Sequence, residues 1–245
     1  MRVSLCLRSG AILALALAGA GCIRVEQTLT LNADGTGIID LTYGMREEQI
    51  GPLQETARSL LAGEAGADAE AMPFDFSDAD VRRDFKEFEA DGVFLDSVQT
   101  TTREGWRFRR LVIRFKSLAA LARTGFLADR HVSLTRDARG NYSFVQSSNG
   151  GNGTGAFSAL AAMPADGGFQ EVLDGFRAVI RVRTPGRILR TNSPERSDRT
   201  AAWTFDLEQD PDALEKAQQA AMQIVFDGSG LSIPEFRTPP GTPRG

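Results

Sequence analysis

The architecture follows first from residues 25–43, which read VEQTLTLNADGTGIIDLTY. Apolar residues alternate with polar ones on both sides of a central turn: Val25, Leu29 and Leu31 before it, and Ile39, Leu41 and Tyr43 after it. A period of two is typical of a strand with one buried face. The Asp34-Gly35 pair between the two runs tolerates the positive φ of a tight turn. These residues therefore predict an antiparallel hairpin.

The same pattern predicts two more hairpins. One joins strands at 93–102 and 106–115 through the polar turn Arg103-Glu104-Gly105. The other has a turn at Arg139-Gly140-Asn141. Its strands are marked by Val132, Leu134, Tyr142 and Phe144.

The strand at 106–115 changes phase. Its apolar residues fall in two sets of opposite parity: Trp106 and Phe108, then Leu111, Ile113 and Phe115. A bulge near Arg109-Arg110 would bring both sets to one face, so we expect a bulge there. Together with Arg107 and Arg114, these arginines make the strand unusually basic.

Later strands and several short helices complete the pattern. Strands are expected at 177–183, where Ala178, Ile180 and Val182 alternate with Arg177, Val179, Arg181 and Arg183, at Trp203 to Leu207, and at Met222 to Phe226. Helices are expected in five places. The first follows Pro52, where Leu53, Ala57, Leu60 and Leu61 have helical spacing, and the second follows a Ser77 or Asp78 cap, with Val81, Phe85 and Phe88 on one face. The others are expected at Ser117 to Arg123 before Gly125, around Phe169 to Phe176, and from Asp212 to about Ala221, with Asp210 as cap and Pro211 at the first position. Residues 63–72 and 147–155 are expected to be mobile loops.

These elements predict an α+β fold. A largely antiparallel sheet, built from hairpins and accompanied by several short helices, would form a single domain. The predicted boundaries are a signal peptide at 1–21, the folded domain at 22–236, and a disordered tail at 237–245 that contains Pro239, Pro240 and Pro243.

The N-terminus has the pattern of an export signal. Arg2 and Arg8 precede an apolar run from Ala11 to Ala20, which is shorter than the roughly 20 residues that cross a bilayer as a helix. Gly21 then leads into Cys22, and a cysteine in that place resembles a bacterial lipobox. We expect cleavage between Gly21 and Cys22 and lipidation of Cys22 with diacylglyceryl and palmitate-type chains.

The lipobox match departs from the usual motif in one position. Gly19 stands where Leu is usual, and Leu17 lies two residues earlier, so an ordinary signal peptide is the alternative. Ile23 in place of Asp after the cysteine resembles the signal for transport to an outer membrane, if the host has one. We therefore expect the chain in the cell envelope, anchored to a membrane outside the cytoplasm.

The charge and the cysteine content limit the ligands and the compartment that are expected for this chain. The chain has 28 basic and 32 acidic residues; without residues 1–21, which include Arg2 and Arg8 and no acid, it has 26 and 32, a net charge of −6. An acidic chain of this kind is not expected to bind nucleic acid. Cys6 and Cys22 are the only cysteines, so the predicted mature body is thiol-free, as suits an oxidising compartment.

Two segments resemble the LppM-type family of bacterial lipoproteins. One runs from Cys22-Ile23-Arg24-Val25 to the turn Asp34-Gly35-Thr36-Gly37, and the other is Thr184-Pro185-Gly186 followed by Thr191-Asn192 and the strand Trp203-Thr204-Phe205. The resemblance covers about a fifth of the chain. It implies an envelope domain that handles lipid or glycolipid, with no catalytic residue to carry over.

No residue pattern points to catalysis, a cofactor or a metal. His131 is the only histidine and has no cysteine in the mature chain to share a metal with, so we expect a structural or solvated role. The motifs that superficially suggest chemistry are better explained as a flexible loop at 150–155, a hairpin turn at 34–37, and charged helix surfaces at Glu47-Glu48 and Glu87-Glu89. Gly228-Ser229-Gly230 lacks the spacing of a nucleophile elbow. The chain is not expected to be an enzyme.

Two functions remain open. The first is a non-catalytic lipid- or hydrophobe-binding module with an apolar pocket behind a curved sheet. The second is a structural or assembly lipoprotein that presents a protein-binding surface. An acyl-sized pocket would favour the first, and a filled core with an exposed apolar patch would favour the second. An arginine face along 106–115 and 177–183 would suit a protein partner or anionic lipid headgroups.

Overall fold

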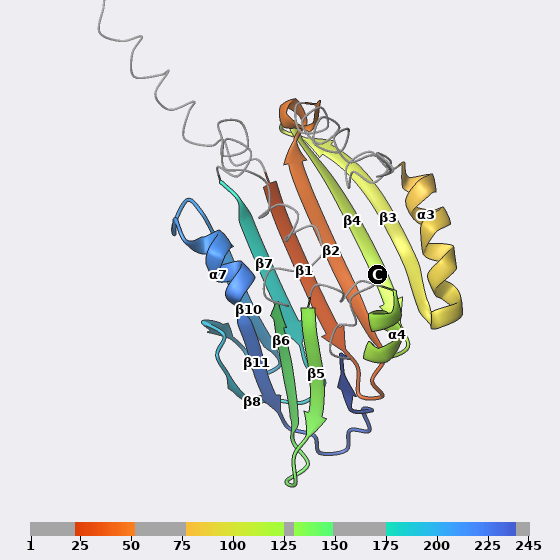
Figure 1. The fold of residues 1–245 in the computed structure, drawn as a ribbon, viewed down its shortest axis with the longest axis vertical. Coiled ribbons are helices and arrows are strands. Elements are labelled where there is room, and N and C mark those ends of the chain that lie inside the picture. The colour runs from red at the N-terminus through yellow and green to blue at the C-terminus, as the bar shows by residue number, and fades with distance from the viewer. Residues whose placement is uncertain (1–22, 52–76, 125–129, 149–174, 239–245) are drawn as a thin grey trace, which may run out of the picture.

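Two sheets packed face to face form the body of the protein. A computed structural model describes residues 23–51, 77–124, 130–148 and 175–238. One sheet has seven strands and the other has five. The five-stranded sheet covers the end of the larger sheet that carries the first hairpin turn, and the opposite end extends beyond it (Figure 1).

The seven-stranded sheet has the order β3-β4-β2-β1-β7-β10-β9. Its strands are β1 (Ile23–Leu31), β2 (Gly37–Arg46), β3 (Val93–Arg103), β4 (Trp106–Phe115), β7 (Arg177–Arg183), β9 (Glu195–Arg196) and β10 (Thr200–Asp206). Every neighbouring pair is antiparallel except β1 and β7, which run parallel with Arg24 opposite Arg177. The strand at the N-terminus of the described chain therefore lies in the middle of the sheet.

The five-stranded sheet has the order β12-β5-β6-β11-β8 and is antiparallel throughout. Its strands are β5 (Arg130–Arg136), β6 (Tyr142–Ser148), β8 (Ile188–Thr191), β11 (Ala221–Phe226) and β12 (Phe236–Arg237). After β7 the chain crosses to this sheet for β8 and then returns to the larger sheet for β9 and β10. Because the chain passes from one sheet to the other and back, the two sheets belong to a single domain.

The helices are short and lie beside the sheets. The helix α3 (Asp78–Phe85) continues into the 3-10 helix η1 (Lys86–Asp91) and lies along β3 (Figure 1). Ser117 caps α4 (Leu118–Arg123) by accepting a hydrogen bond from Ala120 N at 3.0 Å. The helix α7 (Ala213–Gln219) packs near β10, and residues 47–51 form a helical turn after β2.

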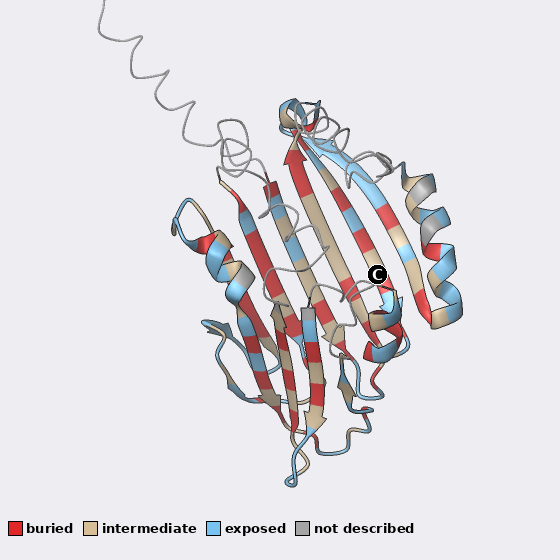
Figure 2. Cartoon of the chain, viewed as in Figure 1, coloured by how far each residue is buried: buried red, intermediate tan, exposed pale blue. Residues whose placement is uncertain are grey.

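The core fills the space between the two sheets. Side chains of odd-numbered residues on β1 and β2 face inward together with those of Leu111, Ile113 and Phe115. They meet the inward residues of the smaller sheet, among which Leu134, Phe144 and Ile224 are at most 1% exposed. Figure 2 shows this alternation of buried and more exposed residues along the strands. Because the interior is closely packed, the burial of these large side chains determines which face of each strand points inward.

The hairpins are confirmed, and their turns are as the sequence predicts. Gly35 has φ of 86°, and Asp34 Oδ1 accepts hydrogen bonds from Thr36 N at 3.0 Å and Thr36 Oγ1 at 2.7 Å. These bonds hold the pKa of Asp34 below its usual value. Glu104 and Gly105 both have positive φ, at 53° and 73°, in the two-residue turn between β3 and β4.

The predicted bulge near Arg109-Arg110 is wrong. β4 pairs with β2 without interruption from Trp106 opposite Arg46 to Phe115 opposite Gly37. The irregularity lies instead on the neighbouring strand, between Leu95 and Ser97 of β3. Trp106 and Phe108 therefore stay on the face opposite to the core residues of the same strand.

Several other predictions need correction or lie outside the described residues. The structure has two sheets in place of the one predicted, and β8 was not predicted. The helix α7 begins at Ala213 and not at Asp212, and Phe176 directly precedes β7 outside any helix. The ordered chain also continues beyond the predicted end of the domain at 236, because Arg237 lies in β12 and Thr238 is bonded to Val132. Outside the described residues lie the signal peptide at 1–21, the helix after Pro52, the loop at 63–72, Gly125, most of the 147–155 loop, the rest of the 169–176 helix, and residues 239–245. The α+β assignment with mainly antiparallel strands holds.

Candidate functional site

The face of the seven-stranded sheet that points away from the smaller sheet is rich in arginine. We call it the outer face. The register of β1, β2, β3, β4 and β7 places the arginines of that face at Arg24, Arg46, Arg103, Arg110, Arg114, Arg177, Arg181 and Arg183. They come from five adjacent strands. Because successive side chains of a strand point to opposite faces, these arginines lie on the face opposite to the core.

Fewer carboxylates share this face. Those on the described strands are Glu26, Asp40, Asp96, Glu195 and Asp206. Eight arginines against five carboxylates leave an excess of three positive charges, whereas the whole chain has a formal charge of −4. Charge is thus segregated, and the outer face is where an anion would be attracted.

Two arginines of β4, Arg110 and Arg114, are held in ion pairs on the outer face. Arg110 donates from Nε and Nη2 to the two oxygens of Asp40 at 2.9 and 2.6 Å. This bidentate hydrogen bonding lowers the pKa of Asp40 and raises that of Arg110, and the charge of Arg183 lowers the pKa of Asp40 further. Arg114 bonds Asp96 in the same two-pronged way, at 3.3 and 3.0 Å.

Two pairs on β1, β7 and β10 are looser. Arg181 Nη1 lies 3.3 Å from Glu26 Oε2, and Arg177 Nε lies 3.4 Å from Asp206 Oδ2. Pairs as exposed as Arg181 and Glu26 add at most about 1 kcal/mol to stability, since solvent screens them.

The end of the outer face where β1 begins has a different character. Arg24 lies over the ring of Trp106 with Cζ 4.4 Å from the centroid, and Arg46 lies 5.3 Å from the same ring. Trp106 stacks on Phe108 at 5.7 Å with 15° between the planes, and Arg103 lies 4.8 Å from the Phe108 centroid. We call these five residues the cationic–aromatic cluster.

A glycine under the cluster makes room for it. Gly44 lies opposite Phe108 across β2 and β4, and a Cβ at Gly44 would lie 2.4 Å from Phe108 Cδ1. The Phe108 ring thus lies directly on the Gly44 backbone. Trp106 is 5% exposed even though it points away from the core, because the stacked ring and two guanidinium groups cover it.

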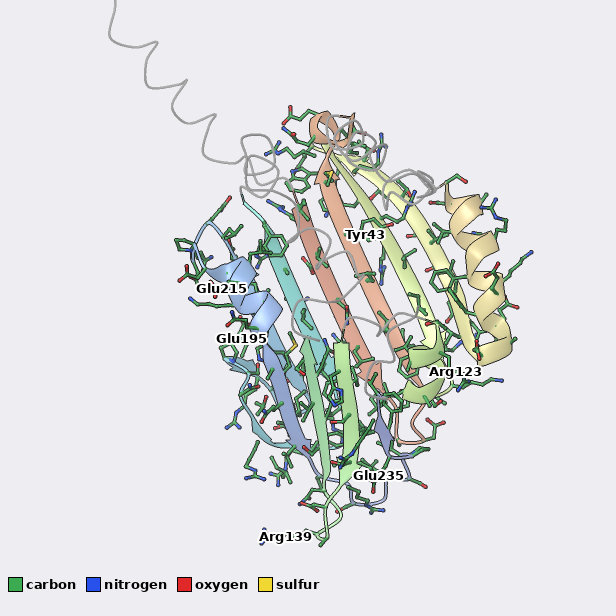
Figure 3. The ribbon with its side chains drawn as sticks, in the orientation of Figure 1. Tyr43, Arg123, Arg139, Glu195, Glu215 and Glu235 are labelled. Atoms are coloured by element: carbon green, nitrogen blue, oxygen red, sulfur yellow. The ribbon has the colours of Figure 1, made fainter. Side chains whose placement is uncertain are left out.

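A second polar group lies on the inner face, near Tyr43 on the part of the sheet that β5 and β6 do not reach (Figure 3). Arg109 is 8% exposed, donates from Nε to Thr100 Oγ1 at 3.1 Å, and lies 3.7 Å from Asp78 Oδ1. Thr100 Oγ1 donates to the same Asp78 oxygen at 2.8 Å. Burial raises the pKa of Tyr43, and nearby Arg109 opposes this rise. These bonds attach the start of α3 to the sheet, which is a structural role.

Two hollows among the described residues differ from an acyl-chain pocket in size or in polarity. One of about 330 Å³ has a polar lining that includes Arg187, Arg196 and Asp198. Another, with an apolar lining that includes Leu118, Ile233 and Phe236, is about 150 Å³. Ligand pockets are usually larger than 300 Å³ and mostly apolar, so neither hollow meets both conditions.

Comparison with known proteins gives a structural neighbour. No family model matches the sequence, and no curated protein matches it. The NMR structure of the folded domain of Mycobacterium tuberculosis LppM is similar to this chain, with a TM-score of 0.43 and 13% sequence identity over 86% of this chain and 95% of that domain. Because the identity is so low, we infer function from this chain's own side chains, and membership of the LppM-type family stays a prediction.

The residues that the sequence suggests for chemistry do not form a site where the structure describes them. His131 is exposed on β5, and within the described ranges no three histidine, cysteine or acidic side chains gather as a metal site would require. Residues 34–36 and 228–230 lie in turns or irregular chain, and Gly37 begins β2. Glu47, Glu48, Glu87 and Glu89 are exposed. Gly21, Cys22 and residues 150–155 lie outside the description. None of the described helices is long and apolar enough to cross a membrane.

The cationic–aromatic cluster was not foreseen. The basic character of residues 106–115 and 177–183 was noted, but Arg24, Arg46 and Arg103 come from three other strands and no local pattern links them. The opposite parity of Trp106 and Phe108 was the available signal. Both rings alternate with the core residues Leu111, Ile113 and Phe115 of the same strand. A strand without a bulge would therefore place them on the outer face, and only the assumption that aromatic residues belong in the core argues against this.

Proposed function

We propose that this chain is a lipid-anchored envelope protein without catalytic activity, and that the outer face of its seven-stranded sheet binds the headgroups of anionic lipids. The observation that supports it best is the charge segregation: the described strands place eight arginines and five carboxylates on the outer face of a chain that is acidic overall. Guanidinium groups form bidentate hydrogen bonds with phosphate, and each basic residue near an anionic membrane adds about 1 kcal/mol to binding.

The anchor predicted at Cys22 supports the same function. Ile23 is the first residue of β1, so no linker separates Cys22 from the sheet. Consecutive Cα atoms are about 3.8 Å apart, so a lipid on Cys22 would hold the start of β1 at the membrane surface. The arginine-rich face then lies within reach of the headgroups.

Lipid binding through a pocket has less support than binding through the surface. The inner residues of both sheets are buried against one another, and the hollows at 187–198 and 117–119 are too polar or too small for an acyl chain. The assembly function would be favoured by an exposed apolar patch, and Leu189 is the large apolar side chain exposed on the described surface, at 37%. Within the described residues neither criterion is met, and the charge of the arginine face gives the surface-binding function more support.

The anchor is tested by intact-mass measurement of the native protein extracted in detergent. We expect a mature chain that begins at Cys22 and carries a diacylglyceryl group. An unmodified cysteine in the mature protein would refute the lipoprotein assignment.

The face is tested by sedimentation with vesicles. The chain from residue 22 with Cys22→Ser retains every described strand and has no anchor. We expect it to sediment with vesicles that contain phosphatidylglycerol and not with pure phosphatidylcholine, and to be released as NaCl rises from about 0.05 M to about 0.5 M. Equal binding to both lipids, or no binding to either, would refute the function. Capture of an acidic protein in place of lipid would support the assembly alternative.

A further inference from the structure

The cationic–aromatic cluster differs from the rest of the outer face in how its charge is compensated. Farther along β4, Arg110 and Arg114 are each held by both oxygens of a carboxylate. Among the described residues, Arg24 and Arg103 have no carboxylate within ion-pair distance, and aromatic rings lie beneath their guanidinium groups instead. The guanidinium groups of Arg24 and Arg103 therefore combine uncompensated positive charge with an aromatic surface.

The rings position these arginines without neutralising them. A cation over an aromatic face gains about 0.5–1 kcal/mol and keeps its charge and its hydrogen-bond donors. Arg24 and Arg46 both lie over Trp106, and the exposed Arg103 lies over Phe108 on the next ring of the stack. Guanidinium groups gathered over two stacked rings are an arrangement that suits an anion with several oxygens, such as a phosphate.

The cluster lies at the end of the sheet nearest to Cys22. Arg24 is the second residue of β1, while Arg46 ends β2, Arg103 ends β3 and Trp106 begins β4. Strand pairing brings these four termini side by side: Arg24 pairs with Gly44, and Arg46 pairs with Trp106. An acyl group on Cys22 would place the cluster in the headgroup layer, where tryptophan and arginine are common at membrane surfaces.

We propose that the cationic–aromatic cluster binds the phosphate of an anionic lipid headgroup in the membrane that holds Cys22. This proposal rests on the proposed function and deepens it. The domain then stands on the bilayer with the cluster end down, and the opposite end of the sheet, which carries Arg183, points away from the membrane. The ion pairs of Arg110 and Arg114 contribute to the stability of the sheet and lie outside the phosphate site.

Trp106 provides a direct reporter of the site. The chain has two tryptophans, and Trp203 lies on the inner face, 7% exposed. In a Trp203→Phe background of the Cys22→Ser chain, tryptophan emission comes from Trp106 alone. Phosphatidylglycerol vesicles mixed with brominated phosphatidylcholine should quench this emission on binding, because the bromines lie just below the headgroups.

The decisive comparison uses two sets of arginine variants in that background. The pair Arg24→Gln and Arg46→Gln removes two charges from the cluster, and we expect vesicle affinity to fall about 30-fold, from the contribution of two basic residues at an anionic surface. The control is Arg183→Gln, which removes an arginine of the same face that also has no carboxylate within ion-pair distance among the described residues. Arg183 lies six residues along β7 from the partner of Arg24, or about 20 Å, beyond the screening length of about 8 Å. We expect its affinity to change less than about twofold.

Replacement of Arg24 and Arg46 by lysine separates a phosphate site from diffuse attraction. Lysine keeps the charge and loses the planar guanidinium, so a phosphate site loses several-fold in affinity while diffuse attraction stays unchanged. In vesicles with oleate in place of phosphatidylglycerol, the net negative charge comes from carboxylates and the only phosphates are those of zwitterionic phosphatidylcholine. We expect weaker quenching of Trp106 by these vesicles at equal net charge. Melting curves for each variant verify folding.

The outcomes distinguish the two proposals. Equal losses for Arg183→Gln and for the cluster variants, or full affinity in the lysine variants, would overturn the phosphate site and leave the lipid-binding face standing. Vesicle binding without any change in Trp106 emission would do the same. If no chain binds anionic vesicles at all, both the site and the proposed function are wrong.

Discussion

The hydroxyl of Tyr142 joins the last part of the described chain to β6, and its removal should be costly. Tyr142 is 1% exposed; its hydroxyl donates to Ile233 O at 3.0 Å and accepts from Ile233 N at 3.0 Å. The ring stacks on Phe226 at 5.5 Å and stays in place when only the oxygen is removed. Tyr142→Phe therefore leaves one buried N–H and one buried C=O of Ile233 without their partner.

The expected loss follows from those two groups. Each buried polar group left without a hydrogen bond costs about 1–3 kcal/mol, so we expect the free energy of unfolding to fall by about 2–4 kcal/mol after partial relaxation. Urea titration measures this loss as a lower midpoint with an unchanged slope. Hydrogen exchange should accelerate first in residues 231–238. A loss under about 0.5 kcal/mol, or a faster exchange spread evenly over both sheets, would refute the reasoning.

Three other substitutions test separate features. Gly44→Ala should displace the Phe108 ring, since the new Cβ would lie 2.4 Å from it; we expect a loss of about 1–3 kcal/mol and a red shift of Trp106 emission in the Trp203→Phe background, and unchanged emission would contradict the stack. Asp40→Asn breaks the bidentate pair with Arg110. Because the folded pKa of Asp40 is lowered, its contribution is present above the ordinary value of 3.8 and lost as pH falls below it, so urea titrations should show a deficit of at most about 1 kcal/mol at pH 7 that vanishes in acid. Ser117→Ala removes the cap of α4 and should cost about 1 kcal/mol in the same assay, whereas Ser117→Thr should cost less.

Local features of the fold could be predicted because local chemistry determines them. The hairpin from Val25 to Tyr43 needs only a period of two and a turn that accepts positive φ, and both are present in contiguous residues. The same is true of the turn at Glu104-Gly105 and of the cap at Ser117. In each case the residues that make the structure are within a few positions of one another.

The division into two sheets could not be predicted in the same way. The parallel pairing of Arg24 with Arg177 joins segments that are far apart in the chain, and only tertiary packing selects it. The strand β8 has four residues, of which Ile188 alone is buried, so it has no periodic pattern to detect. Its place beside β11 depends on Ile188 N and Asp227 N, which bond backbone oxygens of other segments.

The candidate site shows a similar limit. The basic strands were visible in the sequence, and Arg177 and Arg181 do point outward as their alternation with Ala178 and Ile180 predicts. Trp106 was assigned to the core by the general rule that aromatic side chains are buried. It is indeed buried, but on the outer face, under arginines. The missing information was the register of four strand ends, which no single segment contains.

The central position of β1 constrains how the chain can acquire its fold as it emerges with the N-terminus first. One edge of β1 pairs with β2 at once, but the other waits for β7, which follows only after β2 to β6 in the chain. During that interval β1 to β4 present an open strand edge beside an apolar surface that later meets the smaller sheet. A product truncated before Arg177 is therefore prone to aggregate and dependent on chaperones, and it is no smaller version of the domain.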